Sequence, residues 1–159
     1  MISADRANLP FTHLLRARYH NSMLDRILHP IRIVAVQLLF IGMFITTALS
    51  KWHSGVYPPF HKQFDNTWIA KFPGVDAAFY IIAASESLAC ILFILSLITG
   101  EFLRSRRPIL DVAFTGTLLL FMALTYGTFL SSQFDVAAHN FFYFVGTMGL
   151  VYLTRERSA

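Results

Sequence analysis

The sequence is poor in charge and has a single cysteine. Asp, Glu, Lys and Arg together make up only 14% of the 159 residues, whereas hydrophobic residues make up 55%. This balance is too apolar for an ordinary soluble domain, and the mean hydropathy of +0.55 agrees with that. The length suits one domain. We therefore expect an integral membrane protein.

Several kinds of chemistry lack their sequence signatures. The one cysteine, Cys90, lies inside an apolar stretch, so the chain can form neither an internal disulfide nor a CxxC redox pair. We find no zinc-binding spacing, no phosphate- or dinucleotide-binding glycine pattern and no serine in a nucleophile elbow. We therefore expect no metal site, no intrinsic cofactor and no complete catalytic motif. The net charge of +4 fits membrane topology better than nucleic-acid binding.

The first 30 residues hold no apolar core, so we expect no cleavable signal peptide and assign targeting to the first span. Residues 1–30 instead form a basic arm whose apolar residues recur every four positions, as on one face of a helix. These residues are Phe11, Leu15, Tyr19, Met23 and Ile27. We expect an amphipathic helix that ends at Pro30 and lies on the membrane surface, or docks on a larger partner.

Four apolar stretches follow, at about residues 31–50, 75–99, 109–130 and 136–153. Each is long enough to cross a bilayer as a helix. They predict an all-α fold, an integral membrane four-helix bundle that forms one domain over residues 31–159. Aromatic residues in the first loop predict a short interfacial helix, and with Trp52 they would anchor the chain at the interface. These aromatic residues are Phe60, Phe64, Trp68 and Phe72.

Arginine and lysine separate along the chain. All ten arginines lie before or at the start of span 1, between spans 2 and 3, or after span 4, whereas Lys51, Lys62 and Lys71 all lie between spans 1 and 2. With four spans, the arginine-bearing segments share one side of the membrane. Positive charge concentrates on the cytoplasmic side. We therefore expect both termini to be cytoplasmic, and the membrane to be a bacterial inner membrane.

Glu86 lies in the middle of span 2, roughly 16 Å from its start at 1.5 Å per residue. A carboxylate at that depth must be neutral, find a cation or face a wet cavity. One interpretation is a protonated link to Gln37 or to a threonine of span 3; the other is a proton relay or a ligand contact. We expect Lys51 to extend outward to the interface, because contact with Glu86 would need an unwound span end or a wet cavity.

Span 4 carries polar residues near its start. Asp135 and His139 are four residues apart and share a helix face, so the carboxylate can fix the imidazole tautomer. Asn140 adds a donor and an acceptor beside them. Interfacial capping is the simpler interpretation. The functional one makes these three residues, with Glu86 and Lys51, candidates for ligand binding or proton relay.

Parts of residues 31–153 resemble the DoxX-like family of small four-span membrane proteins. The segments that carry the resemblance are ALSKWHSG at the end of span 1, the following PPFHKQF, SESLACILFILSLITGEF across span 2, and the basic break before span 3. The resemblance implies that Lys51 and Glu86 belong to a site that opens to the outer side. It also implies a link either to thiol oxidation at the quinone pool or to the assembly of other membrane proteins.

Two functional hypotheses follow. The first is an accessory subunit of a membrane redox complex, in which Glu86, Lys51 and His139 help to bind a quinone or a lipid. The second is an assembly factor or structural subunit without a catalytic role. Both place the chain in a lipid bilayer beside other membrane-protein subunits. A small channel or transporter is a weaker third hypothesis, because four spans with one buried acid would have to form oligomers.

Overall fold

A computed structural model gives the architecture of the chain. It describes the backbone of residues 11–54, 62, 64, 67, 71 and 74–154, and the side chains of these residues from 27 onward. This described part is helical and contains no strand. The elements in chain order are α1 (Phe11–Ser54), α3 (Val75–Ile98), the short 3-10 helix η2 (Glu101–Leu103), α4 (Pro108–Leu130) and α5 (Phe134–Thr154).

Four helices in the described part are long and apolar enough to cross a membrane, which indicates an integral membrane protein. The candidate spans are Ile27–Ser54, Val75–Ile98, Pro108–Leu130 and Phe134–Thr154. These bounds lie within a few residues of those expected from the sequence. The agreement is good because about 20 apolar residues bounded by polar or turn-forming residues specify a membrane helix almost by themselves.

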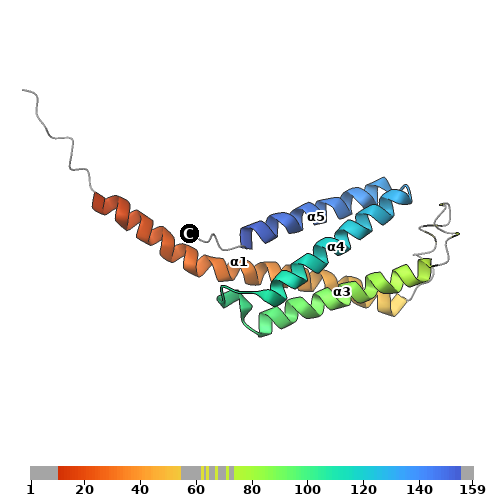
Figure 1. Cartoon of the computed structure of the whole chain (residues 1–159), viewed down its shortest axis with the longest axis horizontal. Coiled ribbons are helices and arrows are strands. Elements are labelled where there is room, and N and C mark those ends of the chain that lie inside the picture. The colour runs from red at the N-terminus through yellow and green to blue at the C-terminus, as the bar shows by residue number, and fades with distance from the viewer. Residues whose placement is uncertain are drawn as a thin grey trace, which may run out of the picture.

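The expected break at Pro30 is wrong, because α1 runs without interruption from Phe11 to Ser54 with Pro30 inside it. Proline removes one amide donor, so the carbonyl of Arg26 loses its partner four residues ahead. The remaining hydrogen bonds on both sides keep the 44-residue helix continuous. Its N-terminal part projects beyond the other helices (Figure 1). That this part lies on a membrane surface stays a prediction.

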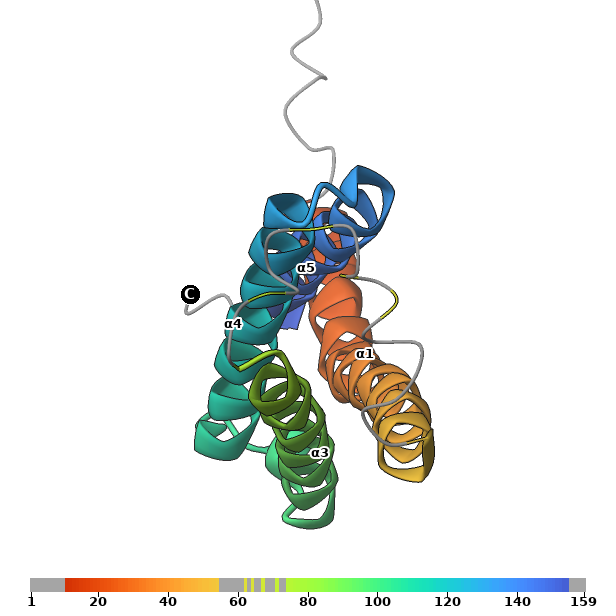
Figure 2. The same ribbon diagram turned by 90° about the vertical axis from the view of Figure 1, so that its right-hand side faces the viewer.

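Neighbouring helices in the chain pack against each other in turn. Helix α3 packs between α1 and α4, and α5 packs mainly on α4. Seen from one end of the bundle, α5 lies at the top of the view, α4 runs down the left side, α1 runs down the right side and α3 lies at the bottom between them (Figure 2). Helix α5 is the most peripheral span, with 11% of its apolar window buried against 33% for each of the others.

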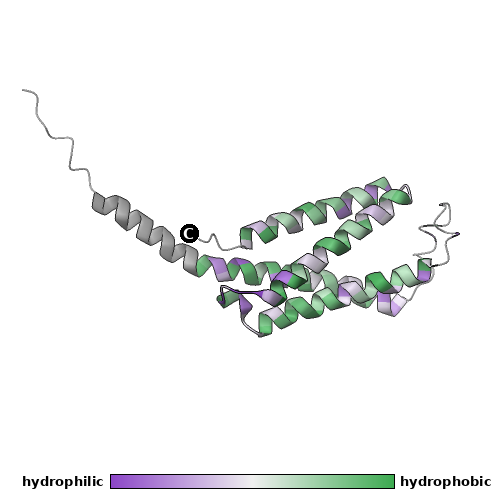
Figure 3. Ribbon diagram, in the orientation of Figure 1, coloured by the Kyte–Doolittle hydropathy of each residue, from purple (hydrophilic) through white to green (hydrophobic). Residues whose placement is uncertain are grey.

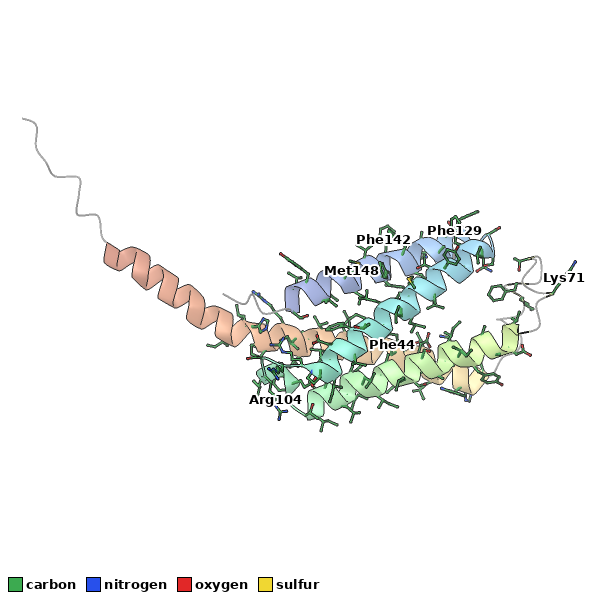
Figure 4. The ribbon with its side chains drawn as sticks, viewed as in Figure 1. Phe44, Lys71, Arg104, Phe129, Phe142 and Met148 are labelled. Carbon is green, nitrogen blue, oxygen red and sulfur yellow. The ribbon has the colours of Figure 1, made fainter. Side chains whose placement is uncertain are left out.

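The centre of the bundle is an aromatic cluster. Phe40 stacks on Phe93 with ring centroids 5.0 Å apart, and Phe114 meets Phe93 edge-on at 5.4 Å. Phe44 stacks on Phe121 at 6.1 Å. Phe44 lies inside the bundle, whereas Phe142 and Met148, both exposed, lie on α5 (Figure 4). This aromatic packing joins α1, α3 and α4. In lipid, helices associate through such close packing, because burial of apolar surface alone drives no association there.

The turn between α3 and α4 forms a polar end of the bundle (Figure 3). Gly100 has φ of 69°, in the left-handed region that ends a helix at little cost when the residue has no Cβ. Arg104 and Arg106 are exposed in this turn, and Arg32 of α1 is exposed as well. Arg104 and Lys71 lie toward opposite ends of the bundle (Figure 4). We call these ends the arginine end and the lysine end.

The expected interfacial helix at residues 60–72 falls mostly outside the described residues, and so do its anchors Phe60, Trp68 and Phe72. Phe64 is described and half-buried. Thr67 donates its amide and its hydroxyl to the carbonyl of Phe64, both at 2.8 Å.

Candidate functional site

Lys51 and Glu86 form an ion pair between α1 and α3. The Lys51 ammonium donates to both oxygens of the Glu86 carboxylate, at 2.7 Å each. The Glu86 side chain is only 6% exposed, whereas that of Lys51 is 26% exposed. The Glu86 carboxylate is thus buried in the bundle. The Lys51 ammonium covers it, and one side of the Lys51 side chain is still accessible.

The geometry of α1 explains why Lys51 reaches inward. Helical side chains lean toward the N-terminus of their own helix. Lys51 lies in the last turn of α1, so its four-carbon stem runs back along the span toward the middle of the bundle. The expectation that Lys51 extends outward is therefore wrong. The contact also forms without an unwound span end, because α1 is helical through Ser54 and α3 is helical on both sides of Glu86.

The ion pair also bears on the first interpretation of Glu86, a neutral link to Gln37 or to a threonine of span 3. Gln37 donates to Ser96 at 2.8 Å instead of pairing with Glu86. In span 3 the buried Thr117 donates to the carbonyl of Ala113 in its own helix. The neutral link from Glu86 to Gln37 or to a span 3 threonine, one of the two interpretations, is therefore absent. The partner of the carboxylate is the Lys51 ammonium, at 2.7 Å from both oxygens.

Two aromatic residues flank the ion pair. The Trp52 indole nitrogen donates to the Ser87 hydroxyl at 3.0 Å, and the Trp52 and Tyr80 rings lie 6.3 Å apart. Both rings are about half exposed, at 54% and 48%. Trp52 therefore holds α1 against α3 beside the charges, and it presents an amphipathic surface next to the accessible side of Lys51.

A second polar cluster lies nearer the arginine end. Gln37 donates to Ser96, and the Ser96 hydroxyl donates to Glu101 Oε2 at 2.9 Å. The Glu101 carboxylate also accepts the backbone amides of Ile109 and Leu110 at 3.0 and 2.8 Å. These amides belong to the first turn of α4, where free donors and the helix dipole favour a carboxylate. We call the chain of groups from Gln37 to these amides the capping network.

The capping network is deeply buried, with Gln37 and Ser96 both at 0% exposure and Glu101 at 3%. Along α1 and α3 the aromatic cluster lies between it and the ion pair, because Phe40 and Phe44 follow Gln37, and Phe93 precedes Ser96. The described interior therefore has three layers. Polar groups occupy both sides of a mainly aromatic layer, in which the Thr117 hydroxyl and the Cys90 thiol each contact a backbone carbonyl.

An arginine joins three helices at the arginine end. Arg107 Nη1 donates to the carbonyl of Thr154 at the end of α5, at 2.9 Å. Its Nη2 lies 3.0 Å from His29 Nε2 on α1, and its Nε donates to the Arg104 carbonyl at 2.8 Å. Arg107 itself immediately precedes α4 and is 8% exposed. This contact ties the far end of α5 to α1.

The remaining candidates lie on α5, apart from the ion pair. Asp135 and His139 are exposed and Asn140 is half-buried. Among the described residues, no hydrogen bond joins any of these three to Lys51 or Glu86, and no group of three His, Cys, Asp or Glu side chains is placed to hold a metal ion. Their role as ligand contacts or relay groups stays a prediction.

Comparisons of the chain with protein-family models, with curated proteins and with solved structures gave no match. The DoxX-like resemblance thus stays a prediction. The chemistry of the site is argued from its own geometry.

Sequence reasoning identified both partners of the ion pair but missed Glu101 and Arg107. Both follow α3 in a short turn that reads as a polar break between spans. Acidic residues are favoured beside a helix N-terminus, but Glu101 lies seven residues before Pro108, so no local capping pattern indicated its contact with the first turn of α4. The contact from Arg107 to His29 joins residues 78 positions apart, and no local pattern indicates it.

Proposed function

We propose that the chain is an accessory subunit of a membrane complex that holds the polar head of an amphipathic ligand at the Lys51–Glu86 pair. The observation that carries the proposal is the pair itself, a buried carboxylate neutralised by an ammonium that keeps one side accessible. Charges within a membrane span are costly and usually serve a function. A buried ion pair is weak evidence for a purely stabilising role, because two apolar residues in its place often stabilise a protein equally well.

The ammonium can bind an acceptor without leaving Glu86. Lysine carries three N–H donors, and two directions are taken by the oxygens of Glu86. A third donor suits a quinone carbonyl or a lipid phosphate, while Trp52 and Tyr80 offer ring faces to the apolar part of the ligand. The DoxX-like resemblance favours the quinone. Any electrons would come from a redox partner, because this chain cannot form a cysteine pair.

The ligand experiment uses the full-length protein, purified from membranes and reconstituted in nanodiscs. Binding of a short-chain quinone would be measured by quenching of tryptophan fluorescence. We expect the double variant Lys51→Met/Glu86→Gln to weaken binding at least tenfold, because it removes the donor and leaves no unpaired charge. The matched control is Phe142→Leu on the exposed surface of α5.

Three outcomes are informative. Equal binding by wild type and the double variant would overturn the proposal, as would no binding to a folded wild type. Binding of an anionic lipid in place of the quinone, with the same dependence on Lys51, would retain the site and change the ligand. Copurification of a redox protein with the wild type would support the accessory-subunit role.

An assembly factor or structural subunit is the second candidate function. The observation that favours it is the length of α1, which is 44 residues or about 66 Å at 1.5 Å per residue, twice what a membrane requires. A projecting helix is suited to docking on another protein. Removing residues 1–26 separates the candidates, since it would abolish copurification with a partner but leave ligand binding unchanged.

We further propose that the arginine end is cytoplasmic, in a bacterial inner membrane. The start of α1 and the end of α5 lie toward the same end of the bundle (Figure 1). In the sequence, all ten arginines lie before or at the start of the first span, between the second and third spans, or after the fourth. This distribution supports an orientation with both termini inside.

A further inference from the structure

Three exposed arginine side chains at the arginine end bond to no other described residue. Arg32 belongs to α1, and Arg104 and Arg106 belong to the turn between α3 and α4. Within the described part of the chain, no ion pair or hydrogen bond engages their guanidinium groups. We call these three side chains the arginine patch. A guanidinium group is always charged, and its planar fork of N–H donors fits the oxygens of a phosphate or a carboxylate.

Arg107 holds together the two elements that carry the patch. Its Nη2 lies 3.0 Å from His29 Nε2 on α1, and its Nε donates to the carbonyl of Arg104 at 2.8 Å. Arg32 follows His29 by three residues, so it lies about one turn further along α1. Helix α1 also packs on η2. The patch therefore draws positive charge from two elements that meet, and a ligand bound to both would bridge α1 and the turn.

The acidic side chains described at this end do not pair with the patch. Glu101 is 3% exposed, and its oxygens accept the Ser96 hydroxyl and two backbone amides. Asp111 is exposed in the first turn of α4, where the helix dipole favours an acid. No ion pair or hydrogen bond joins either carboxylate to the three arginines. With the buried Arg107, four described arginines at this end stand against two acids.

Apolar side chains beside the patch are exposed as well. Leu103 directly precedes Arg104 and is 74% exposed, and Ile98 at the end of α3 is 75% exposed. Residues 99–107 alone connect α3 to α4, so the turn stays close to the ends of two spans, at the depth of the lipid headgroups (Figure 4). Guanidinium groups with exposed apolar side chains at that depth match a phospholipid, whose phosphate and acyl chains are adjacent.

We propose that the arginine patch binds the headgroup phosphate of an anionic phospholipid, which bridges α1 and the turn between α3 and α4. The guanidinium groups donate to the phosphate oxygens, and Leu103 contacts the start of an acyl chain. An anionic headgroup is preferred because a zwitterionic one brings its own positive charge to a positive surface. The proposal depends neither on a ligand at Lys51 and Glu86 nor on which compartment the arginine end faces.

Lipid preference can be measured by native mass spectrometry on the full-length protein in detergent. Equal amounts of phosphatidylglycerol and phosphatidylcholine with the same acyl chains are added, and the ratio of the two lipids on the protein is read from the masses of the complexes. We expect phosphatidylglycerol to be enriched at least about fivefold on the wild type, because basic residues near the membrane surface attract anionic headgroups. Higher salt should lower the enrichment, since ions screen exposed charges.

Variants assign the preference to the patch. The triple variant Arg32→Gln/Arg104→Gln/Arg106→Gln should reduce the enrichment to below about twofold, because it removes the charged donors. Lysine at the same three positions keeps the charge without the planar fork, so enrichment should be higher than in the glutamine variant. The matched control is Lys62→Gln/Lys71→Gln, since both lysines are exposed in the loop between α1 and α3. It should keep the wild-type ratio.

Four results would overturn the lipid site. The first is equal binding of the two lipids by the folded wild type, and the second is an enrichment that persists in the glutamine variant. The third is displacement of the lipid by glycerol 3-phosphate at the same concentration, which would show that a free phosphate suffices. The fourth is patch-dependent copurification of an acidic protein without lipid enrichment. Circular dichroism and size-exclusion profiles show that each variant is folded.

Discussion

Lys51 shows how one side chain decides the chemistry of its surroundings. Without it, Glu86 would be a carboxylate at 5% exposure within a span and without a cation beside it, which is costly. The Lys51 ammonium, at 2.7 Å from both oxygens, supplies that cation. A neutral link and an ion pair differ in what they offer a ligand, since only the pair presents a charged donor.

The two charges should be strongly coupled in stability. Either single variant, Lys51→Met or Glu86→Gln, should destabilise the protein by about 2–4 kcal/mol, because one buried charge loses its partner. The double variant should lie within about 1 kcal/mol of the wild type. Thermal unfolding in a mild detergent, arranged as a double-mutant cycle, would measure this coupling.

Additive effects of the two substitutions would contradict the contact, since groups that interact are not additive. Trp52→Phe is a useful companion variant, because it removes one hydrogen bond to Ser87 and leaves both charges in place. It should cost about 1 kcal/mol.

The sequence located both partners of the pair, and the DoxX-like resemblance placed them in one site, but the helix pattern favoured a Lys51 side chain that extends outward. Lys51 and Glu86 are 35 residues apart, and their meeting depends on how far α1 and α3 are shifted along each other. The sequence leaves that shift open. The same holds for Gln37. The sequence showed a polar residue inside span 1 but did not show that it would pair with Ser96. Pairing between helices is set by packing, which single-helix patterns do not contain.

At the scale of elements, the spans were predictable and the long first helix was not. Apolar length and flanking polar residues define each crossing, so the four spans agree closely with the sequence. Pro30 was interpreted as a helix end because proline breaks helices in most soluble settings. Membrane helices tolerate proline more often, and α1 continues through this residue.

The aromatic layer should carry much of the packing between α1, α3 and α4. Phe93 is fully buried and stacks on Phe40 and Phe44, so Phe93→Ala should destabilise the bundle by roughly 2–4 kcal/mol through lost contacts and a cavity. Phe142→Ala on α5 is the control, because that side chain is 69% exposed. It should change stability by less than about 0.5 kcal/mol.

Thermal unfolding of the two variants in the same detergent would give the comparison. Equal losses of stability in the two variants would mean that a ring in the aromatic layer contributes no more to stability than an exposed ring on α5 does. The prediction would then be wrong, and the packing between spans would rest on the polar contacts.

At the scale of the molecule, the arginine end and the lysine end should face opposite compartments. A reporter that is active only inside the cell should work when fused to either terminus, because the arginines that flank the first and last spans are expected on the cytoplasmic side. A cysteine introduced at Lys71, in the Cys90→Ala background, should react with an impermeant thiol reagent added outside intact cells. Reaction of a cysteine at Ser105 instead would reverse the orientation.

The path of the chain also limits how the helices can associate. Each span packs on its neighbour in sequence, and α5 adds to α4 at the edge. Such an order could be anticipated from short connections between spans, since these favour antiparallel neighbours. The position of α5 at the periphery could not be anticipated. Its mean hydropathy of 1.3 is lower than the 1.8 to 2.4 of the other spans, but hydropathy indicates a membrane crossing and not which neighbours a helix has.

The aromatic layer has an electrical consequence. Between Glu86 and the capping network the interior is mainly aromatic, and its described polar groups, the Thr117 hydroxyl and the Cys90 thiol, each contact a backbone carbonyl. Proton hopping needs an unbroken chain of hydrogen-bonding groups or of water. We therefore expect slow proton exchange between the two polar clusters, each of which would exchange protons mainly with its own end of the bundle.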